Sequence, residues 1–328
     1  MTRRPLLALL GIIYVGVIAA GFLTPYDPLV QNRDDAFASP TRVRFVDAQG
    51  VFHLRPFVYG SSHSPDTAYP VQFFVRGDRY RIAGVFASDL HLFGTPGPSR
   101  VFLLGTDQYG RDVFSRLVHG GQISLLAGLL GAGLSLAAGV LLGTLAGFYG
   151  SWVDEAIMRV AELFLALPWL YLLLAVRMML PLHMDPGQTV LLLIAVIALV
   201  GWARPARLVR GLVLHTKVRE YVLAARSLGA SDVQLIWRHV LPQLRGVTLT
   251  QAAVLVPQYT LAEVTLSFFG LGVAEPVPSW GNMLASLQRY HVLASYWWMF
   301  LPALALIPVF LLYYLLADRI HQQTAYSL

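Results

Sequence analysis

The chain is built from long apolar stretches separated by shorter polar ones. A helix that crosses a bilayer needs about 20 predominantly apolar residues. The first apolar stretch follows Arg3 and Arg4 and offers no convincing small-residue cleavage site, so we interpret it as a retained anchor and not as a signal peptide. The pattern predicts six spanning segments in all, at residues 5–23, 117–148, 156–180, 188–209, 246–272 and 292–316.

Residues 24–116 follow a different pattern, in which apolar and polar positions alternate and turn residues recur. A period of two is typical of strands, and Gly and Asp between alternating runs predict hairpin turns. We expect one hairpin around residues 47–50 and a second around Gly77 and Asp78. The pattern therefore predicts a small, mostly β, water-exposed insertion after the first helix.

Composition agrees with a membrane protein, because 56% of the residues are hydrophobic and only 13% are charged. A soluble domain carries about 25% charged residues. The chain has no cysteine, which excludes disulfides, thiolate metal sites and a cysteine nucleophile. We attribute the net charge of +6 to cytoplasmic loops near anionic lipid or a partner protein, and we expect no binding of nucleic acid.

The distribution of basic residues predicts the orientation. Six spans place both termini on the same side, and basic residues concentrate in cytoplasmic loops. The loop at 204–245 contains only Glu220 and Asp232 as acidic residues against a larger basic set, so we place it and both termini in the cytoplasm. The basic residues are Arg204, Arg207, Arg210, Lys217, Arg219, Arg226, Arg238 and Arg245.

Within this loop, the stretch EYVLAARSLGASDVQLIWRHVLPQ predicts two short helices. The first is expected over residues 215–227, and Gly229 suits the left-handed residue that ends a helix. Ser231 and Gln234 have the spacing of a capping box that begins the second helix, and Pro242 is expected to end it. Such a pair is either an amphipathic hairpin on the lipid surface or a protruding knob that a soluble partner grips.

The segment AARSLGASDVQLIWRHVLP resembles the cytoplasmic coupling loop, or EAA motif, of ABC-importer permease subunits in the dipeptide/oligopeptide transport family, specifically the C-type inner-membrane subunit. Further matches occur in order over 101–318, in LLGTDQYGRDVFSRLVHGGQISL, LALP, LSFFGLG and PSWGNML. Two positions depart from the family pattern. Leu223 stands where the family has glutamate before the paired alanines, and Gln243 stands where it often has asparagine.

The resemblance implies an all-α polytopic membrane protein of the bacterial inner membrane, with about six transmembrane helices and a small, mostly β, periplasmic insertion. Its parts would be an N-terminal transmembrane anchor at 1–23, the periplasmic insertion at 24–116, a five-helix permease core at 117–318 and a cytoplasmic tail at 319–328. The coupling loop would occupy 210–245 within the core, with its contact region at 215–242.

The resemblance also implies partners and excludes catalysis by the chain itself. A second homologous permease subunit, two cytosolic ABC ATPases and a periplasmic or extracellular substrate-binding protein would complete the importer. ATP and Mg would bind to the ATPases, since no GxGxxG or P-loop lysine motif occurs in this chain, and we expect no cofactor here. The coupling residues carried over are Glu220, Tyr221, Ala224, Ala225, Gly229, Ala230, Ser231, Asp232, Gln234, Arg238, His239 and Pro242.

Other candidate residues lie within or beside the spans. An ionisable residue in a membrane segment is a functional candidate, so Glu263 either lines the pathway or pairs within the bundle. Asp107, Arg111 and Asp112 either order a gate on the outer face, contact the binding protein, or form a capped turn with local ion pairs. Small residues one turn apart allow close helix contact, within the subunit or at an interface, and they are Gly139, Gly143 and Gly147.

Alternative functions stay open at this point. The histidines show no metal-ligand spacing, so we expect no metal site. Peptides are the favoured substrate, and nickel, a glycan or a peptide antibiotic are alternatives within the same transporter class. An intramembrane enzyme would need a nucleophile with a base, and a GxSxG elbow or paired membrane aspartates are not visible. A membrane sensor or scaffold would leave the coupling-loop match unexplained.

Overall fold

The computed structural model describes residues 3–47, 49–59, 68–82, 85–95, 100–181 and 184–325. These residues form two compact units that are interleaved along the chain. Unit 1 comprises Met1–Leu9, Leu125–Leu266 and Pro308–Leu328, and unit 2 comprises Leu10–Ser124 and Ser267–Ile307. The expected fold class is confirmed, because helices dominate both ends of the sequence and a small, mostly β insertion follows the first helix.

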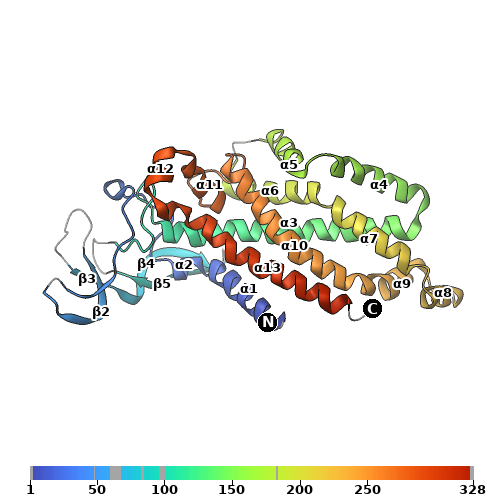
Figure 1. Cartoon of the computed structure of the whole chain (residues 1–328), viewed down its shortest axis with the longest axis horizontal. Helices are drawn as coiled ribbons and strands as arrows, with labels where there is room; N and C mark the ends of the chain where they lie inside the picture. The colour runs from blue at the N-terminus through green and yellow to red at the C-terminus, as the bar shows by residue number, and fades with distance from the viewer. Residues whose placement is uncertain are drawn as a thin grey trace. The chain divides into compact units, whose positions relative to one another are not determined.

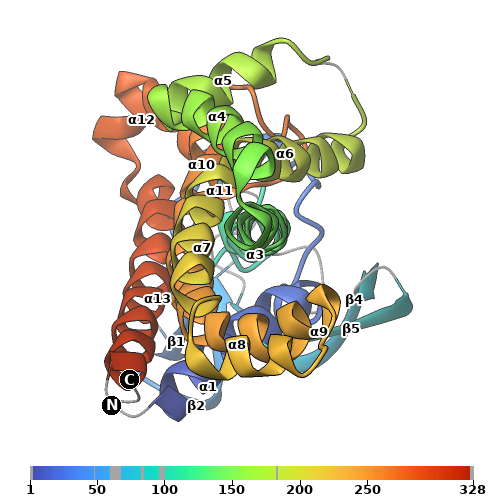
Figure 2. The ribbon, with the colours of Figure 1, turned by 90° about the vertical axis from the view of Figure 1, so that its right-hand side faces the viewer.

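Unit 1 is helical. It contains most of α3 (Val113–Tyr149) and of α10 (Arg245–Phe268), and the second part of α13 (Leu301–Ala325). The other helices are α4 (Ser151–Ala166), α5 (Trp169–Met178), α6 (Pro186–Gly201), α7 (Ala203–Thr216), α8 (Glu220–Ser227) and α9 (Asp232–Leu235). Figure 1 and Figure 2 show α7 running beside α3, with α8 and α9 next to each other beyond the end of α7.

Glycines of α3 bring this helix close to α7. A Cβ atom on Gly139 would lie 2.6 Å from the Pro205 Cβ, and one on Gly147 would lie 2.8 Å from the Val213 Cβ. A Cβ on Gly143 would press against the carbonyl oxygen of Ala206. Glycine is therefore required along this face, and the spacing serves packing within the chain.

Two of the predicted straight segments are bent. The segment at 156–180 divides into α4 and α5, whose axes meet at 93°. Pro168 follows the break, and it holds Leu167 in an extended conformation because a residue before proline avoids the α region. The segment at 188–209 divides into α6 and α7, which meet at 42° around Trp202.

By length and hydropathy, two single helices of the described residues qualify as spans, Val113–Tyr149 and Trp297–Gln322. The number rises to four if each bent pair is one span. The first helix is divided into α1 (Arg3–Ile18) and α2 (Ala20–Leu23), so the expected count of six stays a prediction. The last helix continues to Ala325, well past residue 316, so the predicted tail at 319–328 is helical up to that point, and 326–328 lie outside the described residues.

Unit 2 contains the β insertion. The strands β1 (Arg44–Val46), β2 (Phe52–Tyr59) and β3 (Ala68–Pro70) form an antiparallel sheet in that order. The strands β4 (Gln72–Ile82) and β5 (Phe86–Gly94) form a two-stranded antiparallel ribbon. A cluster of Val58, Val71, Phe93 and Val101 joins the sheet to the ribbon. The short helices α11 (Trp280–Ala285) and α12 (Tyr290–Ser295) complete the unit with three 3-10 turns, at Arg33–Asp35, Ser286–Gln288 and Trp297–Phe300.

One predicted hairpin is confirmed and the other is wrong. β1 and β2 pair across residues 47–50, where the Asp47 carboxylate accepts backbone hydrogen bonds from Gln49 and Val51. Gly77 and Asp78, however, lie inside β4, at a register shift in the ribbon. A Cβ on Gly77 would lie 2.8 Å from His91 Cδ2, so this glycine allows a close cross-strand contact and does not form a turn.

Candidate functional site

The loop between α7 and α10 begins with a lysine contact to the end of α3. The Lys217 ammonium group donates to the carbonyls of Gly147 at 2.7 Å and Phe148 at 3.3 Å. These carbonyls belong to the last turn of α3, where a cation is favoured by the helix dipole. The predicted start of the first loop helix, at residue 215, is wrong. In the structure α7 ends at Thr216 and α8 begins at Glu220.

The sharp turn after α8 is a Schellman motif. The N–H of Gly229 donates to the carbonyl of Arg226 at 3.0 Å, and the N–H of Ala230 donates to Ala225 at 3.1 Å. Gly229 has a φ of 88°, which glycine adopts without the steric cost that a side chain would bring. The predicted C-terminal cap is confirmed.

The second helix begins with the predicted capping box. The N–H of Gln234 donates to the Ser231 hydroxyl at 3.4 Å, and the N–H of Ser231 donates to the Gln234 side chain at 3.0 Å. Pro242 does not end the helical path, which passes through a π-helical segment (Ile236–Val240) and a 3-10 turn (Leu241–Leu244) into α10. Proline has no N–H to donate, and these irregular turns accommodate it.

The base of the loop is fixed by a hydrophobic cluster. Val222 of α8 and Leu235 of α9 are 2% and 0% exposed, and both pack against the ends of α3 and α7. Full burial of one such side chain contributes about 1.5–3 kcal/mol to stability. The two short helices are therefore packed against the ends of α3 and α7. The full cluster consists of Phe148, Val209, Val213, Val222, Leu235, Val240 and Leu244.

The tip of the loop is exposed and carries apolar side chains among arginines. Leu228, next to the turn, is 89% exposed, and Leu223 is 47% exposed at the position where the resembling family has glutamate. Val233 and Trp237 of the second helical segment are also exposed. The predicted contact region at 215–242 contains these four residues, but they were not among the individual coupling residues carried over. Their signal was the presence of large apolar residues in the most basic loop of the chain.

The coupling residues predicted from the sequence are all brought into this loop. Ala225, Ala230, His239 and Pro242 are partly buried, and the ring of His239 packs 6.1 Å from that of Tyr221. The exposed members are Glu220, Tyr221, Ala224, Gly229, Ser231, Asp232, Gln234 and Arg238. The loop therefore combines a buried base with an exposed outer surface.

Unit 2 contains an ion cluster in which Asp107, Arg111 and Arg116 are buried and the side chain of Glu275 is 42% exposed. Arg111 donates to Asp107 at 2.7 Å and to both oxygens of Glu275, at 2.6 and 3.2 Å. Arg116 donates to the same two oxygens, at 3.0 and 3.1 Å. Burial alone would lower the pKa of Arg111, but the hydrogen bond with Glu275 and the nearby carboxylates raise it. Sequence reasoning missed Arg116 and Glu275, since they meet only in the folded chain.

Asp112 does not share this cluster. Its Oδ2 accepts hydrogen bonds from the N–H of Ser115 at 2.8 Å and from the Ser115 hydroxyl at 2.6 Å, which caps the first turn of α3. Burial raises the pKa of Asp112 to about 6, although the hydrogen bonds from Ser115 act in the opposite direction. Asp107 also accepts the N–H of Tyr109 at 2.8 Å, so turn capping and local ion pairing are both present.

Glu263 lies on α10 in unit 1, and its side chain is fully buried. A pathway role for Glu263 stays a prediction. No group of three or more His, Cys, Asp or Glu side chains is placed to hold a metal ion within the part of the chain that the structure describes.

Comparisons with known proteins complete the description. Residues 139–326 match the family described as "Binding-protein-dependent transport system inner membrane component". The chain is 39% identical over 207 residues to the dipeptide transport system permease protein DppC of Bacillus subtilis, covering 63% of this chain and 62% of that protein. It is 37% identical over 210 residues to the oligopeptide transport system permease protein OppC of the same organism, covering 63% and 65%. It thus spans less than two thirds of either relative's length.

A solved structure of the MetNI methionine ABC transporter in inward-facing conformations is also similar. The match has a TM-score of 0.48 at 16% sequence identity, and it covers 64% of this chain and 96% of that one.

Proposed function

Because the chain belongs to the family of binding-protein-dependent transport system inner membrane components, we propose that it is the permease subunit of an ATP-binding-cassette importer for peptides. The names of its relatives, which include dipeptide and oligopeptide transport system permease proteins, support this substrate class. In this proposal the chain forms half of a translocation pathway with a second permease. Two cytosolic ATPases bind ATP and Mg, a binding protein delivers the peptide, and the chain itself catalyses no reaction.

The observation that carries the proposal is the contrast within the loop between a buried base and an exposed tip. Val222 and Leu235 fasten the loop to α3 and α7, and Leu228 projects from the turn. Closure of the ATPases on ATP would displace the tip. Because the base packs against two long helices, that displacement would be passed on to them as a rigid movement and would not be absorbed in the loop.

The exposed residues also indicate the chemistry of the ATPase surface. Leu223 and Leu228 would fit an apolar groove, and exposed Arg226 and Arg238 would pair with acidic groups at its rim. Leu223 supplies no charge at the family's glutamate position, so the contact there would be apolar. Binding of cytosolic ATPases to this loop requires the loop to lie in the cytoplasm, and the proposal places both termini on the same side.

The test is co-purification of the tagged full chain from its native membrane, comparing Leu228→Asp with Leu54→Asp. Both leucines are 89% exposed, so neither substitution is expected to disturb folding. We expect Leu228→Asp to lose the ATPases and keep the second permease, and Leu54→Asp to keep both. If the wild-type chain brings down no ATPase, or Leu228→Asp retains it fully, the coupling proposal is wrong, and a lipid-surface hairpin, a sensor or an intramembrane enzyme becomes the better account.

The substrate is tested separately, by uptake of labelled dipeptides and oligopeptides into cells that lack this chain. A peptide importer loses uptake when the chain is removed, and recovers it when the chain is restored. Unchanged peptide uptake alongside intact ATPase binding would instead favour nickel, a glycan or a peptide antibiotic as the substrate.

A further inference from the structure

The β4–β5 ribbon exposes an unusual number of large apolar side chains. Phe73 and Phe74 of β4 are 62% and 63% exposed, Val85 before β5 is 74% exposed, and Phe86 is 71% exposed. Phe73 pairs with Phe93 near one end of the ribbon and Phe86 pairs with Ile82 at the other, so exposed apolar side chains occur at both ends. Exposed apolar surface of this kind marks an interaction site. A two-stranded ribbon is also marginally stable by itself, so it depends on the surface that supports it.

The ribbon is fastened to the end of the first helix. His91 of β5 contacts the carbonyl of Thr24 through Nδ1 at 2.5 Å, and the rings of Phe22 and Phe74 are 6.4 Å apart. The Tyr80 ring occupies the space where a Cβ on Gly21 would lie. α2 therefore packs against both strands of the ribbon.

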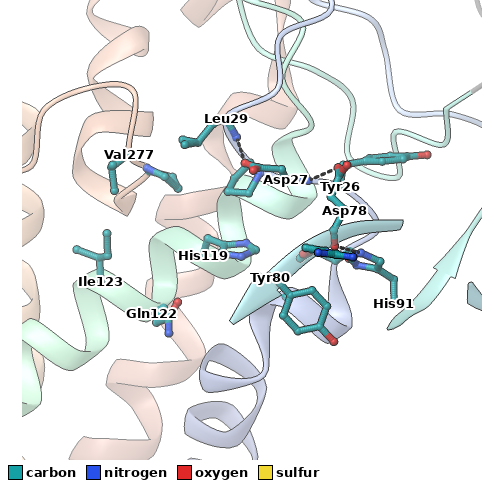
Figure 3. Close-up of a pocket in the computed structure, with 15 residues that line it drawn as sticks. Tyr26, Asp27, Leu29, Asp78, Tyr80, His91, His119, Gln122, Ile123 and Val277 are labelled. Carbon is teal, nitrogen blue, oxygen red and sulfur yellow. Dashed lines mark hydrogen bonds between the residues drawn. The ribbon is translucent and has the colours of Figure 1, made fainter. Parts of the chain in front are cut away.

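Polar contacts beside a small pocket complete this attachment. The N–H of Asp27 donates to the Asp78 carboxylate at 3.3 Å, and His91 contacts the carbonyl of Asp78 through Nε2 at 2.9 Å. Figure 3 shows these groups on one side of the pocket, with His119 of α3 pointing toward the strand that carries Asp78 and Tyr80. The pocket has a volume of about 300 Å³. The position of the ribbon is thus set by α2 and the segment that follows it.

The first helix in turn sets the depth of the ribbon in the membrane. Ile12, Val15 and Ile18 of α1 are 67%, 66% and 38% exposed and lie three residues apart, so they share one apolar face. In an inner-membrane protein, such a face contacts lipid. Beyond α2 the sequence becomes polar, at Thr24 and Asp27, which places this point at the boundary between acyl chains and headgroups.

The ribbon combines these apolar side chains with arginines. Arg76, Arg79 and Arg81 of β4 are exposed. Phe86 and Leu90 lie four residues apart on β5 and so share one face, which their cross-strand partners Ile82 and Arg76 also share. Aromatic rings at headgroup level and arginines on lipid phosphates are the features of a surface that binds a membrane interface.

We propose that the β4–β5 ribbon lies on the membrane surface at the outer end of the first helix and anchors the insertion there. Phe74 and Phe86 enter the boundary between headgroups and acyl chains, and the arginines of β4 bind lipid phosphates. The apolar face of α1 continues into the ribbon through the Phe22–Phe74 contact. The partner is therefore phospholipid, and this property is separate from the transport function proposed above.

Fluorescence quenching by spin-labelled lipid tests the proposal. Because the chain has no cysteine, a single introduced cysteine can be labelled specifically. An environment-sensitive fluorophore is attached through Phe86→Cys, and through Ile12→Cys and Leu54→Cys as controls. The full chain is reconstituted in vesicles of equal parts phosphatidylethanolamine and phosphatidylglycerol, with a nitroxide near the headgroup of one tracer lipid, which tests position 86, and in the middle of the acyl chain of another, which tests position 12. We expect quenching at positions 12 and 86, and none at position 54 in the separate three-stranded sheet.

A variant with Arg76→Gln, Arg79→Gln and Arg81→Gln tests the role of the phosphates. We expect it to reduce quenching at position 86 while leaving position 12 unchanged, which shows that the chain is still inserted. The proposal is overturned if position 86 is unquenched while position 12 is quenched, or if position 54 is quenched equally. It is also overturned if position 86 becomes shielded from aqueous iodide only when partner subunits are present, since the ribbon would then dock a protein.

Discussion

The loop at 220–244 and the ion cluster of Asp107, Arg111, Arg116 and Glu275 use arginine in opposite ways. In the cluster, the side chains of Arg111 and Arg116 are 3% and 1% exposed and share one carboxylate. In the loop, Arg226 and Asp232 form an ion pair that is about half exposed, and Leu228 projects beside it. Buried and fully paired arginines hold distant segments of the chain together. Exposed arginines beside apolar side chains leave a surface that a second molecule can cover.

Replacing Glu275 with alanine is expected to destabilise the ion cluster strongly. The change leaves Asp107 as the remaining carboxylate for two buried guanidinium groups. Because Glu275 is itself 42% exposed, we expect a loss near the lower end of the roughly 3–5 kcal/mol that breaking a buried ion pair costs. The matched control is Glu155→Ala, because Glu155 and Arg159 form a pair whose side chains are 70% and 73% exposed. Such exposed pairs contribute about 0–1 kcal/mol.

The measurement is the thermal unfolding midpoint of the purified full chain in detergent. We expect a large decrease for Glu275→Ala and almost none for Glu155→Ala. Equal decreases would mean that the ion cluster contributes no more to stability than an exposed pair, and the structural role assigned to it would be wrong.

The base and the tip of the loop provide the second comparison. Leu235 is fully buried, so Leu235→Ala removes packed methyl groups and is expected to cost about 2–5 kcal/mol in unfolding free energy. Leu228→Ala removes the same atoms from a side chain that is 89% exposed, and should leave stability unchanged. ATPase co-purification should fall in both variants. If Leu228→Ala destabilised the chain as much as Leu235→Ala, the tip would be part of the core.

The parts of the site that were predicted depend on short-range signals. Gly229 and the Ser231–Gln234 pair form their caps with residues three to five positions away, so spacing alone identified them. Glu275 is 164 residues from Arg111, and no local pattern shows that the two meet. Gly77 was misinterpreted for the same reason, because the His91 side chain that requires a glycine comes from another strand. The break at Leu167 was visible in Pro168, but the apolar composition around it hid the bend.

Asp112 makes the stability of the chain depend on pH. Its pKa is raised by burial from 3.8 to about 6, so between these values the folded chain binds a proton more tightly than the unfolded chain does. The free energy of unfolding therefore falls as the pH rises from about 4 to about 6, by up to roughly 3 kcal/mol. Asp112→Asn keeps a side-chain oxygen for Ser115 and cannot ionise, so we expect a flatter pH profile of the unfolding midpoint.

The opposite sign is expected for Asp47, a partly buried carboxylate that accepts several hydrogen bonds. The hydrogen bond with His53 and those from the Val51 and Gln49 backbone lower the pKa of Asp47. Asp47 therefore adds stability at neutral pH that is lost as the pH falls through its pKa, and Asp47→Asn should remove that loss. If both variants changed the profile in the same direction, burial would not be the cause of the shift at Asp112.

The smallest expected effect concerns the turn that presents the tip. A Cβ on Gly229 would meet no atom within 4 Å, so Gly229→Ala costs only the strain of a positive φ, about 1 kcal/mol. Gly211→Ala is the matched control, because Gly211 also has open space but lies inside α7, where alanine is favoured by about 1 kcal/mol.

Hydrogen exchange at the amides of the loop measures both changes. We expect faster exchange at Gln234 and Ala230 in Gly229→Ala, and equal or slower exchange in α7 in Gly211→Ala. If the turn is held open for a partner, ATPase binding should weaken about fivefold in Gly229→Ala alone, which corresponds to about 1 kcal/mol. Unchanged exchange and binding would mean that the turn tolerates a side chain, and that the tip owes its position to the cluster around Leu235 and not to the Schellman motif.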